Sequence, residues 1–217
     1  MDPAVVHGRI RCLKKEELMK KIGITGGIGA GKTAVTDHLQ ELGYIVIDTD
    51  QMSRDMTAPG GKAIPYIREK FGDDLIDETG AMDRKKMRDL VFRDSKKLAL
   101  LEQGTTMVLI KDLKKLSHEL ELKGNRVVFY AIPLLFEIGS SMEYDATWLV
   151  TADDETRIRR VMKRDGVDRE NVIRIMKKQM PEEEKKKLAS DVIVNDGDLE
   201  SLRKQVDELL SKYGLSN

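Results

Sequence analysis

The chain of 217 residues is long enough for one well-buried core, alone or with a mobile subdomain, and short for two independent domains. Its 38 Lys and Arg residues balance 38 Asp and Glu residues, so no global field draws it to nucleic acid or to an anionic membrane. A 35% charged fraction beside 40% hydrophobic residues excludes a disordered chain and a disulfide scaffold. With Cys12 as its single cysteine, the protein is expected to be one catalytic unit in a reducing cytoplasm.

The first 20 residues form a basic segment without the apolar run of a signal peptide. Met19, followed by two lysines and a strand pattern, resembles an ordinary start. We therefore expect residues 1–20 to be an N-terminal extension, either a start-site artefact or an added basic helix, before a catalytic domain over 21–217. No stretch approaches the ~20 apolar residues of a membrane span, which predicts a soluble protein without a membrane partner, as a monomer or small homo-oligomer.

From residue 21 onward, short β-branched apolar runs alternate with longer amphipathic stretches, a pattern typical of βαβ units on a parallel sheet. Strands are expected at Lys21–Thr25, Tyr44–Asp48, Arg126–Ala131, Ala146–Thr151 and Val192–Asn195. Helices are expected at Lys32–Leu42, Gly61–Phe71, Arg84–Phe92, Lys96–Leu122, Asp153–Arg164, Arg169–Gln179 and Leu199–Tyr213. The sequence thus predicts an open α/β fold with a five-stranded parallel sheet flanked by helices.

Two regions depart from this simple alternation. Roughly 75 residues pass between Asp48 and Arg126 without a convincing strand, far more than one crossover helix needs, which predicts a helical insert over 51–122. In the second region, 157–187, basic and acidic residues dominate and Pro181 interrupts the helical pattern. This region is either a mobile lid or a plain solvated pair of helices.

The sharpest motif is the run from Gly26 to Thr33, an unbroken G-x-x-x-x-G-K-T between a predicted strand and a predicted helix. Its glycines let backbone N–H groups approach phosphate oxygens, and the helix that begins at Lys32 adds the positive end of its dipole. Lys32 can reach the β- and γ-phosphates of a nucleoside triphosphate, and the Thr33 hydroxyl can coordinate Mg²⁺. A glycine-rich turn that only packs tightly is the alternative. Nucleotide contacts are expected from Gly27, Gly29, Ala30, Gly31, Lys32, Thr33 and Ala34.

An acidic pair, Asp48 and Asp50, follows the second predicted strand, where a parallel sheet presents residues to its ligand crevice. Phosphoryl transfer to a hydroxyl needs a carboxylate that orients the nucleophile and accepts its proton. We expect Asp50 to be this general base and Asp48 to position the substrate or hold the metal, directly or through water. The alternative for Asp48 is the cap of a helix that starts near Gln51.

Arginines in the second irregular region could bind the transferring phosphoryl group, because bidentate guanidinium donors stabilise its charge. Arg157, Arg160 and Arg164 lie three and four residues apart and share a helical face. A closing lid could turn this face toward the triphosphate. A solvated surface is the other interpretation of the same pattern.

Several motifs in order resemble the dephospho-coenzyme A kinase family from Lys21 to about Leu210. The phosphate loop is similar to the family's T-G-G-I-G-x-G-K, Asp48-Thr49-Asp50 to its D-x-D, and Pro133 opens a P-L-L-F-E segment. Further agreements are Arg54, Pro59-Gly60, Phe71-Gly72, Asp83-Arg84, Phe92, Glu155-Thr156, Arg160, Arg164-Asp165, Gln179, Asp191 and Asn195.

The resemblance implies a P-loop fold related to nucleoside monophosphate kinases. It implies the ATP- and Mg²⁺-dependent phosphorylation of the ribose 3′-hydroxyl of dephospho-coenzyme A. By this analogy Asp50 is the base, and Arg160 and Arg164 contact the nucleotide. The acceptor is expected at Asp48, Asp50, Arg54, Arg84 and Pro133.

The sequence also departs from the family pattern. Thr106-Met107 stands where relatives usually have His-Pro, Arg157 where glutamine is usual and Ser190 where alanine is usual. The first difference bears on the acceptor side, so another small-molecule kinase acting on a nucleoside or nucleotide, or an inactive nucleotide-binding relative, stays open. A GTPase-type switch would need N-K-x-D, which does not occur in the sequence.

Overall fold

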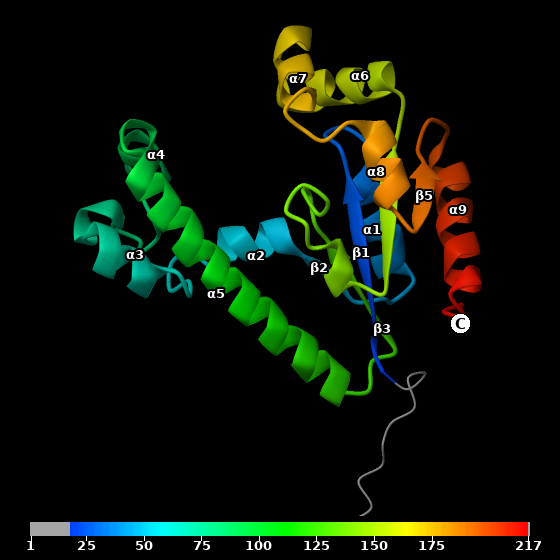
Figure 1. The fold of residues 1–217 in the computed structure, drawn as a ribbon, viewed down its shortest axis with the longest axis horizontal. Helices are drawn as coiled ribbons and strands as arrows, with labels where there is room; N and C mark the ends of the chain where they lie inside the picture. The colour runs from blue at the N-terminus through cyan, green and yellow to red at the C-terminus, as the bar shows by residue number, and fades with distance from the viewer. Residues whose placement is uncertain (1–17, 217) are drawn as a thin grey trace, which may run out of the picture.

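The computed structural model describes residues 18–216, which form a five-stranded, all-parallel sheet with helices on both faces (Figure 1). The strand order is β2-β3-β1-β4-β5. The strands are β1 (Lys20–Gly26), β2 (Val46–Asp48), β3 (Val127–Ala131), β4 (Ala146–Thr151) and β5 (Asp191–Val194). All five expected strands and the parallel sheet are confirmed.

The two faces of the sheet carry separate hydrophobic cores. On one face, α1 (Lys32–Glu41) and α9 (Leu199–Lys212) pack against a cluster centred on Phe129 and Trp148. On the other face, the C-terminal half of α5 (Ser95–Leu122) packs through Leu120 against a cluster that includes Tyr130. Central strands buried on both faces explain the nearly continuous apolar runs in the sequence.

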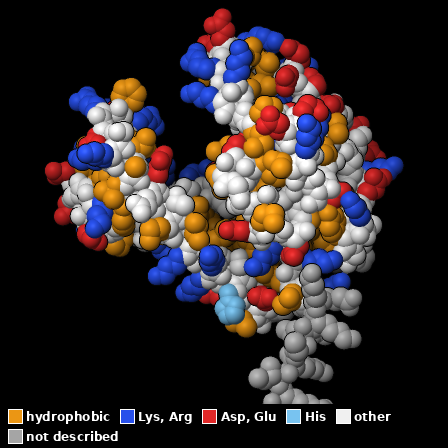
Figure 2. Space-filling model, in the orientation of Figure 1, with side chains coloured by type: hydrophobic (Ala, Val, Ile, Leu, Met, Phe, Trp, Pro, Cys, Tyr) orange, Lys and Arg blue, Asp and Glu red, His pale blue; other side chains and the backbone are white. Residues whose placement is uncertain are grey.

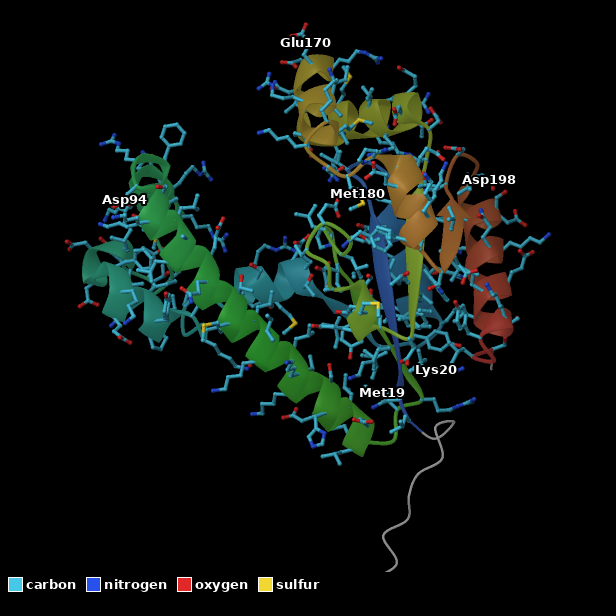
Figure 3. The ribbon with its side chains drawn as sticks, in the orientation of Figure 1. Met19, Lys20, Asp94, Glu170, Met180 and Asp198 are labelled. Carbon is cyan, nitrogen blue, oxygen red and sulfur yellow. The ribbon has the colours of Figure 1, made fainter. Side chains whose placement is uncertain are left out.

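The remaining helices of the predicted insert form a lobe with its own small core. Its helices are α2 (Thr49–Asp55), α3 (Ile64–Phe71), α4 (Arg84–Arg93) and the N-terminal half of α5, with the short 3₁₀ turn η2 (Asp73–Leu75). Met56, Ile67 and Met87 are buried at its centre. Gly104 inside α5 leaves room for the ring of Tyr66, whose hydroxyl donates to the Leu100 carbonyl at 2.8 Å. Figure 3 shows Asp94 at the far tip of this lobe, between α4 and α5.

A second projection follows β4 and contains α6 (Asp154–Asp165) and α7 (Arg169–Met176). Ile158, Val161 and Val172 form a fourth core, a small one, between these two helices. After Pro181 the chain returns to the sheet through α8 (Glu182–Leu188), with Met180 at the base of the projection and Glu170 at its outer end (Figure 3).

Two short helices, α2 and α8, were not among the predicted elements. Each has seven residues, and neither TDQMSRD nor EEEKKKL shows the apolar period of an amphipathic helix. The predicted helices are otherwise present, with ends that differ by up to three residues. Residues 1–17, most of the expected extension, lie outside the described residues. Within 18–216, no helix is both long enough and apolar enough to cross a membrane.

Candidate active site

The phosphate loop lies at the carboxyl end of the central strand β1 and leads directly into α1. Gly31 precedes α1 with φ of 95° and offers no side chain to cap the helix. By contrast, an aspartate side chain caps the first turn in α2, α4, α5, α6, α7 and α9. The N–H donors at the start of α1 are therefore available to an anion, which the helix dipole also favours.

Close packing under the loop explains two of its glycines. A β-carbon on Gly31 would lie 2.0 Å from the amide nitrogen of Asn195, and a β-carbon on Gly29, where φ is 77°, would lie 2.6 Å from the Arg157 carbonyl oxygen. Asn195 itself is buried and donates through Nδ2 to the Ala30 carbonyl at 2.8 Å. Any side chain at either glycine would displace the loop from its support.

The loop opens into a cleft of about 650 Å³. Figure 2 shows the surface hollowed between the insert lobe and the projection formed by α6 and α7. Eleven of the predicted site residues line this cleft, namely Gly27, Gly29, Gly31, Lys32, Thr33, Asp48, Asp50, Arg54, Pro133, Arg160 and Arg164. Residues from the loop, β2, α2, the β3 end and α6 thus converge on one site, although they are far apart in the sequence.

Lys32 is half-buried at the first position of α1 and shares the cleft with two carboxylates. Burial lowers the pKa of its amine below the ordinary value of 10.5, and the charges of Asp48 and Asp50 partly offset this effect. The acids therefore favour the charged lysine that binding of a triphosphate requires.

Arg160 projects from α6 toward the phosphate loop. Its Nη1 lies 3.9 Å from the place where a β-carbon on Gly31 would be. This nitrogen is buried and has no hydrogen-bond partner within residues 18–216. A buried guanidinium donor without a partner is costly, and an anion in the cleft would satisfy it.

Arg164, one turn further along α6, also lines the cleft but is more exposed. Its Nε and Nη2 donate to the carboxylate of Asp165 at 2.7 and 2.8 Å. This hydrogen bond raises the pKa of the Arg164 guanidinium. The Nη1 donors of Arg164 take no part in these two bonds and can contact a phosphate in the cleft.

Asp48 caps α2: its Oδ1 accepts from the backbone N–H groups of Asp50 and Gln51 at 2.8 and 3.1 Å. The capping role considered for Asp48 is thus present, and Oδ2 is left for another ligand. Asp50 lies in the first turn of α2 and is exposed to the cleft. Arg54, one turn later, donates through Nε and Nη2 to Oε1 of Gln51 at 3.2 and 2.9 Å.

Three predicted residues do not line the cleft. Ala30 is buried under the loop, and the Ala34 N–H donates to the Gly31 carbonyl at 3.0 Å. Arg84 lies in the insert lobe, where its Nη2 donates to the Thr57 hydroxyl at 2.8 Å. Arg84 therefore holds the lobe together in this structure rather than facing the loop.

Arg157 departs from the interpretation of the three arginines as one cleft-facing row. Its side chain is buried and lies on the other side of the phosphate loop, where it donates to the Ile28 carbonyl. Sequence reasoning missed this role because a basic residue in a charged helix predicts exposure. Val161 and Ile175, which also line the cleft, carried no sequence signal beyond their apolar spacing.

A phosphate loop at the carboxyl end of a parallel sheet, facing a lysine, an arginine and a carboxylate across one cleft, defines a P-loop kinase. The family model of dephospho-CoA kinase (CoaE) matches residues 20–201. The chain is 43% identical to dephospho-CoA kinase of Cupriavidus pinatubonensis over 198 residues, 90% of this chain and 95% of the relative. It is 38% identical to that of Carboxydothermus hydrogenoformans over 192 residues, 88% and 93% of the two chains. The chain therefore belongs to the dephospho-CoA kinase family.

Solved structures agree with this assignment at the level of the fold. The crystal structure of TT1252 from Thermus thermophilus has a TM-score of 0.76 and 36% identity, and the match covers 92% of this chain and 100% of that one. Dephospho-CoA kinase from Campylobacter jejuni has a TM-score of 0.63 at 20% identity, covering 89% and 97% of the two chains. Shikimate kinase from Acinetobacter baumannii has a TM-score of 0.51 and 20% identity, and the match covers 92% of this chain and 97% of that one. This likeness shows the fold alone.

Proposed function

We propose that the protein transfers the γ-phosphoryl group of ATP to the ribose 3′-hydroxyl of dephospho-coenzyme A, giving ADP and coenzyme A, the last step of coenzyme A synthesis. Membership of the dephospho-CoA kinase family supports the acceptor. The observation that carries the proposal is the opposition, across one cleft, of the uncapped phosphate loop and Asp50, with the unpartnered Nη1 of Arg160 above the loop.

The phosphates of ATP would lie along the loop and the start of α1. The backbone N–H groups there bind phosphate oxygens, and Lys32 and Arg160 offset the charge that develops on the transferring group. Because these donors are held in place before the substrate arrives, little reorganisation is needed during the reaction. Arg164 would add a second guanidinium through its Nη1.

Asp50 would accept the proton of the 3′-hydroxyl. The hydroxyl oxygen then forms a bond to the γ-phosphorus while the bond from that phosphorus to the bridging oxygen breaks, so that ADP leaves and Asp50 holds the proton. Asp48, Arg54 and Pro133 line the same part of the cleft and would position the acceptor. Arg84 would act at a distance, through the lobe that it stabilises.

The residues present fit Mg²⁺. Thr33 is exposed to the cleft directly after Lys32, and Asp48 has one carboxylate oxygen outside its capping bonds. Hydroxyl and carboxylate oxygens are the ligands this cation prefers. When bound, Mg²⁺ would neutralise part of the charge of the triphosphate.

We place the enzyme in the cytoplasm, as a monomer or small homo-oligomer. The proposal rests on the synthesis of coenzyme A from soluble precursors, with ATP and dephospho-coenzyme A as the only partners needed. The region 157–187 would act as the lid of the cleft and exclude water during transfer, while Arg157 and Gln179 keep its base bound to the phosphate loop.

The test is a coupled assay of ADP release with Mg²⁺-ATP. It compares dephospho-coenzyme A with adenosine, AMP and a control without acceptor. Release that depends only on dephospho-coenzyme A supports the proposal. Preference for a nucleoside or nucleotide would keep the kinase and overturn the acceptor, whereas ATP binding without transfer would identify an inactive relative.

A further inference from the structure

The peptide groups of Ile28, in the middle of the phosphate loop, are held from outside the loop by two side chains. The Ile28 N–H donates to Oε1 of Gln179 at 3.0 Å, and the Ile28 carbonyl accepts from Nε of Arg157 at 3.0 Å. Arg157 comes from α6, and Gln179 from the turn after α7. Both donor and acceptor of this one residue are therefore fixed by the projection that carries Arg160.

Arg157 reaches the loop from a buried position. Its side chain is 5% exposed, and Nη1 pairs with Glu182 at 3.2 Å and with Asp154 at 3.3 Å. Burial of a guanidinium is expensive unless its charge and donors are matched, and here two carboxylates and one carbonyl match them. Contacts therefore run from Glu182 in α8 through the Arg157 guanidinium to the Ile28 carbonyl in the loop.

The backbone of the phosphate loop also packs closely against the Arg157 guanidinium. A β-carbon on Gly27 would lie 2.3 Å from Nη2 of Arg157 and 3.2 Å from Oε1 of Gln179, so the backbone of the loop rests directly on these two side chains. The side chain of Ile28 packs against the apolar core between α6 and α7. The loop and the projection are thus joined by apolar contact as well as by hydrogen bonds.

We propose that Arg157 is a positioning residue for nucleotide binding, which acts through the Ile28 carbonyl and never touches the nucleotide. With Gln179 it holds the loop in the shape that directs its N–H groups into the cleft. Because Arg157 and Arg160 lie on the same helix, it also fixes the distance between the loop and the Arg160 guanidinium. The inference rests on the proposed function only in taking the ligand to be a nucleoside triphosphate.

The experiment measures Mg²⁺-ATP affinity by calorimetry without acceptor, in the double variant Arg157→Met/Glu182→Gln. Removing both charges together leaves no buried carboxylate without its partner. Loss of one charge-assisted hydrogen bond that positions the loop is expected to raise Kd about tenfold. In the assay, KM for ATP should rise by a similar factor, while KM for the acceptor should stay within about twofold.

Arg157→Lys is the second variant, because an ammonium can pair with Glu182 but cannot reach the Ile28 carbonyl at the same time. It should restore thermal stability without restoring ATP affinity. The matched control is Arg159→Gln on the same helix, where the guanidinium is exposed and, within residues 18–216, donates only to the Thr156 hydroxyl at 3.2 Å. This control should bind ATP like the unmodified protein.

Hydrogen exchange of the loop amides adds a direct measurement. The Ile28 N–H should exchange faster in both Arg157 variants and should be unaffected by Arg159→Gln. Unchanged ATP affinity together with lower thermal stability would overturn the proposal and leave Arg157 a purely structural residue. Because affinity is measured without acceptor, this outcome is distinct from failure of the unmodified protein to phosphorylate dephospho-coenzyme A.

Discussion

The phosphate loop and the insert lobe face the same cleft, but they are built differently. The loop is supported from several sides, by Asn195 beneath Ala30 and by Arg157 and Gln179 around Ile28. The insert lobe has its own small core and meets the sheet mainly through α2 and α5. The proposed general base, Asp50, lies in α2, a helix without a fully buried side chain.

This contrast suggests a division of work. In the proposed reaction, Lys32 and Arg160 stabilise developing charge from the side of the cleft where other elements hold the loop. The groups that would orient the acceptor and accept its proton lie on or beside the insert lobe. Substitutions on the two sides should therefore separate nucleotide binding and charge stabilisation from acceptor binding and proton transfer.

Lys32→Ala should produce the largest effect. Removal of a preorganised cation at the transferring group is expected to lower kcat by about three orders of magnitude. The fold should persist, because the Lys32 side chain belongs to none of the hydrophobic clusters. Turnover in the coupled assay, with circular dichroism as the check on folding, measures this change. Full activity of this variant would contradict the proposed role of the phosphate loop in the reaction.

Asp50→Asn should lower kcat by about two to three orders of magnitude, because an amide cannot accept the hydroxyl proton. The Kd for ATP, measured without acceptor, should change little, which would separate the acceptor side from the loop. Asp55→Asn is the matched control, since Asp55 is exposed in the same helix and accepts from Gln51 at 2.6 Å. Equal losses in the two variants would point to distortion of α2 and not to a missing base.

Glu137→Gln tests how the loop side of the cleft is held together. Glu137 ends the segment that Pro133 opens, and its Oε1 lies 2.8 Å from Nζ of Lys185 in α8, a lysine that is 1% exposed. Loss of the carboxylate leaves the lysine charge buried without its partner, which is expected to cost on the order of 3 kcal/mol in the free energy of unfolding. Urea denaturation at pH 7 measures it, with Glu183→Gln on the exposed face of α8 as the control.

The same pair predicts a pH dependence. Burial alone would raise the pKa of Glu137, but the hydrogen bond and charge of Lys185 outweigh it and lower the pKa below the ordinary value of 4.5. A lowered folded-state pKa gives stability that is present above about pH 4.5 and is lost as the pH falls through the folded-state pKa. The unmodified protein should therefore lose more stability on acidification than Glu137→Gln. Identical acid profiles would show that the Glu137–Lys185 pair contributes nothing to the free energy of unfolding.

The sequence predicts one side of the comparison better than the other, for physical reasons. The loop motif constrains backbone, helix start and ligand together, so Lys32, Thr33 and their surroundings follow from a short pattern. Arg157 and Lys185 could not be placed from the sequence, because burial of a charged side chain depends on partners such as Glu182 and Glu137 that only the fold brings near. Likewise α2 depends on its Asp48 cap, not on an apolar period.

Met107→Ala should have the smallest effect. Met107 stands, with Thr106, where relatives usually have His-Pro, and in this structure both lie within the continuous helix α5, with Met107 64% exposed and outside the cleft lining. Truncation of an exposed side chain changes energies by about 0.5 kcal/mol, so KM for dephospho-coenzyme A should stay within about threefold.

Met107→Pro provides the contrast at the same position. A proline inside α5 removes a backbone N–H and is expected to lower the free energy of unfolding by about 3 kcal/mol, because the uninterrupted helix joins the insert lobe to the sheet. Urea denaturation and KM for the acceptor measure the two effects separately. A tenfold rise in acceptor KM for Met107→Ala would instead make this residue part of the acceptor site. It would also show that the insert lobe binds substrate along α5, beyond the cleft in which Asp50 lies.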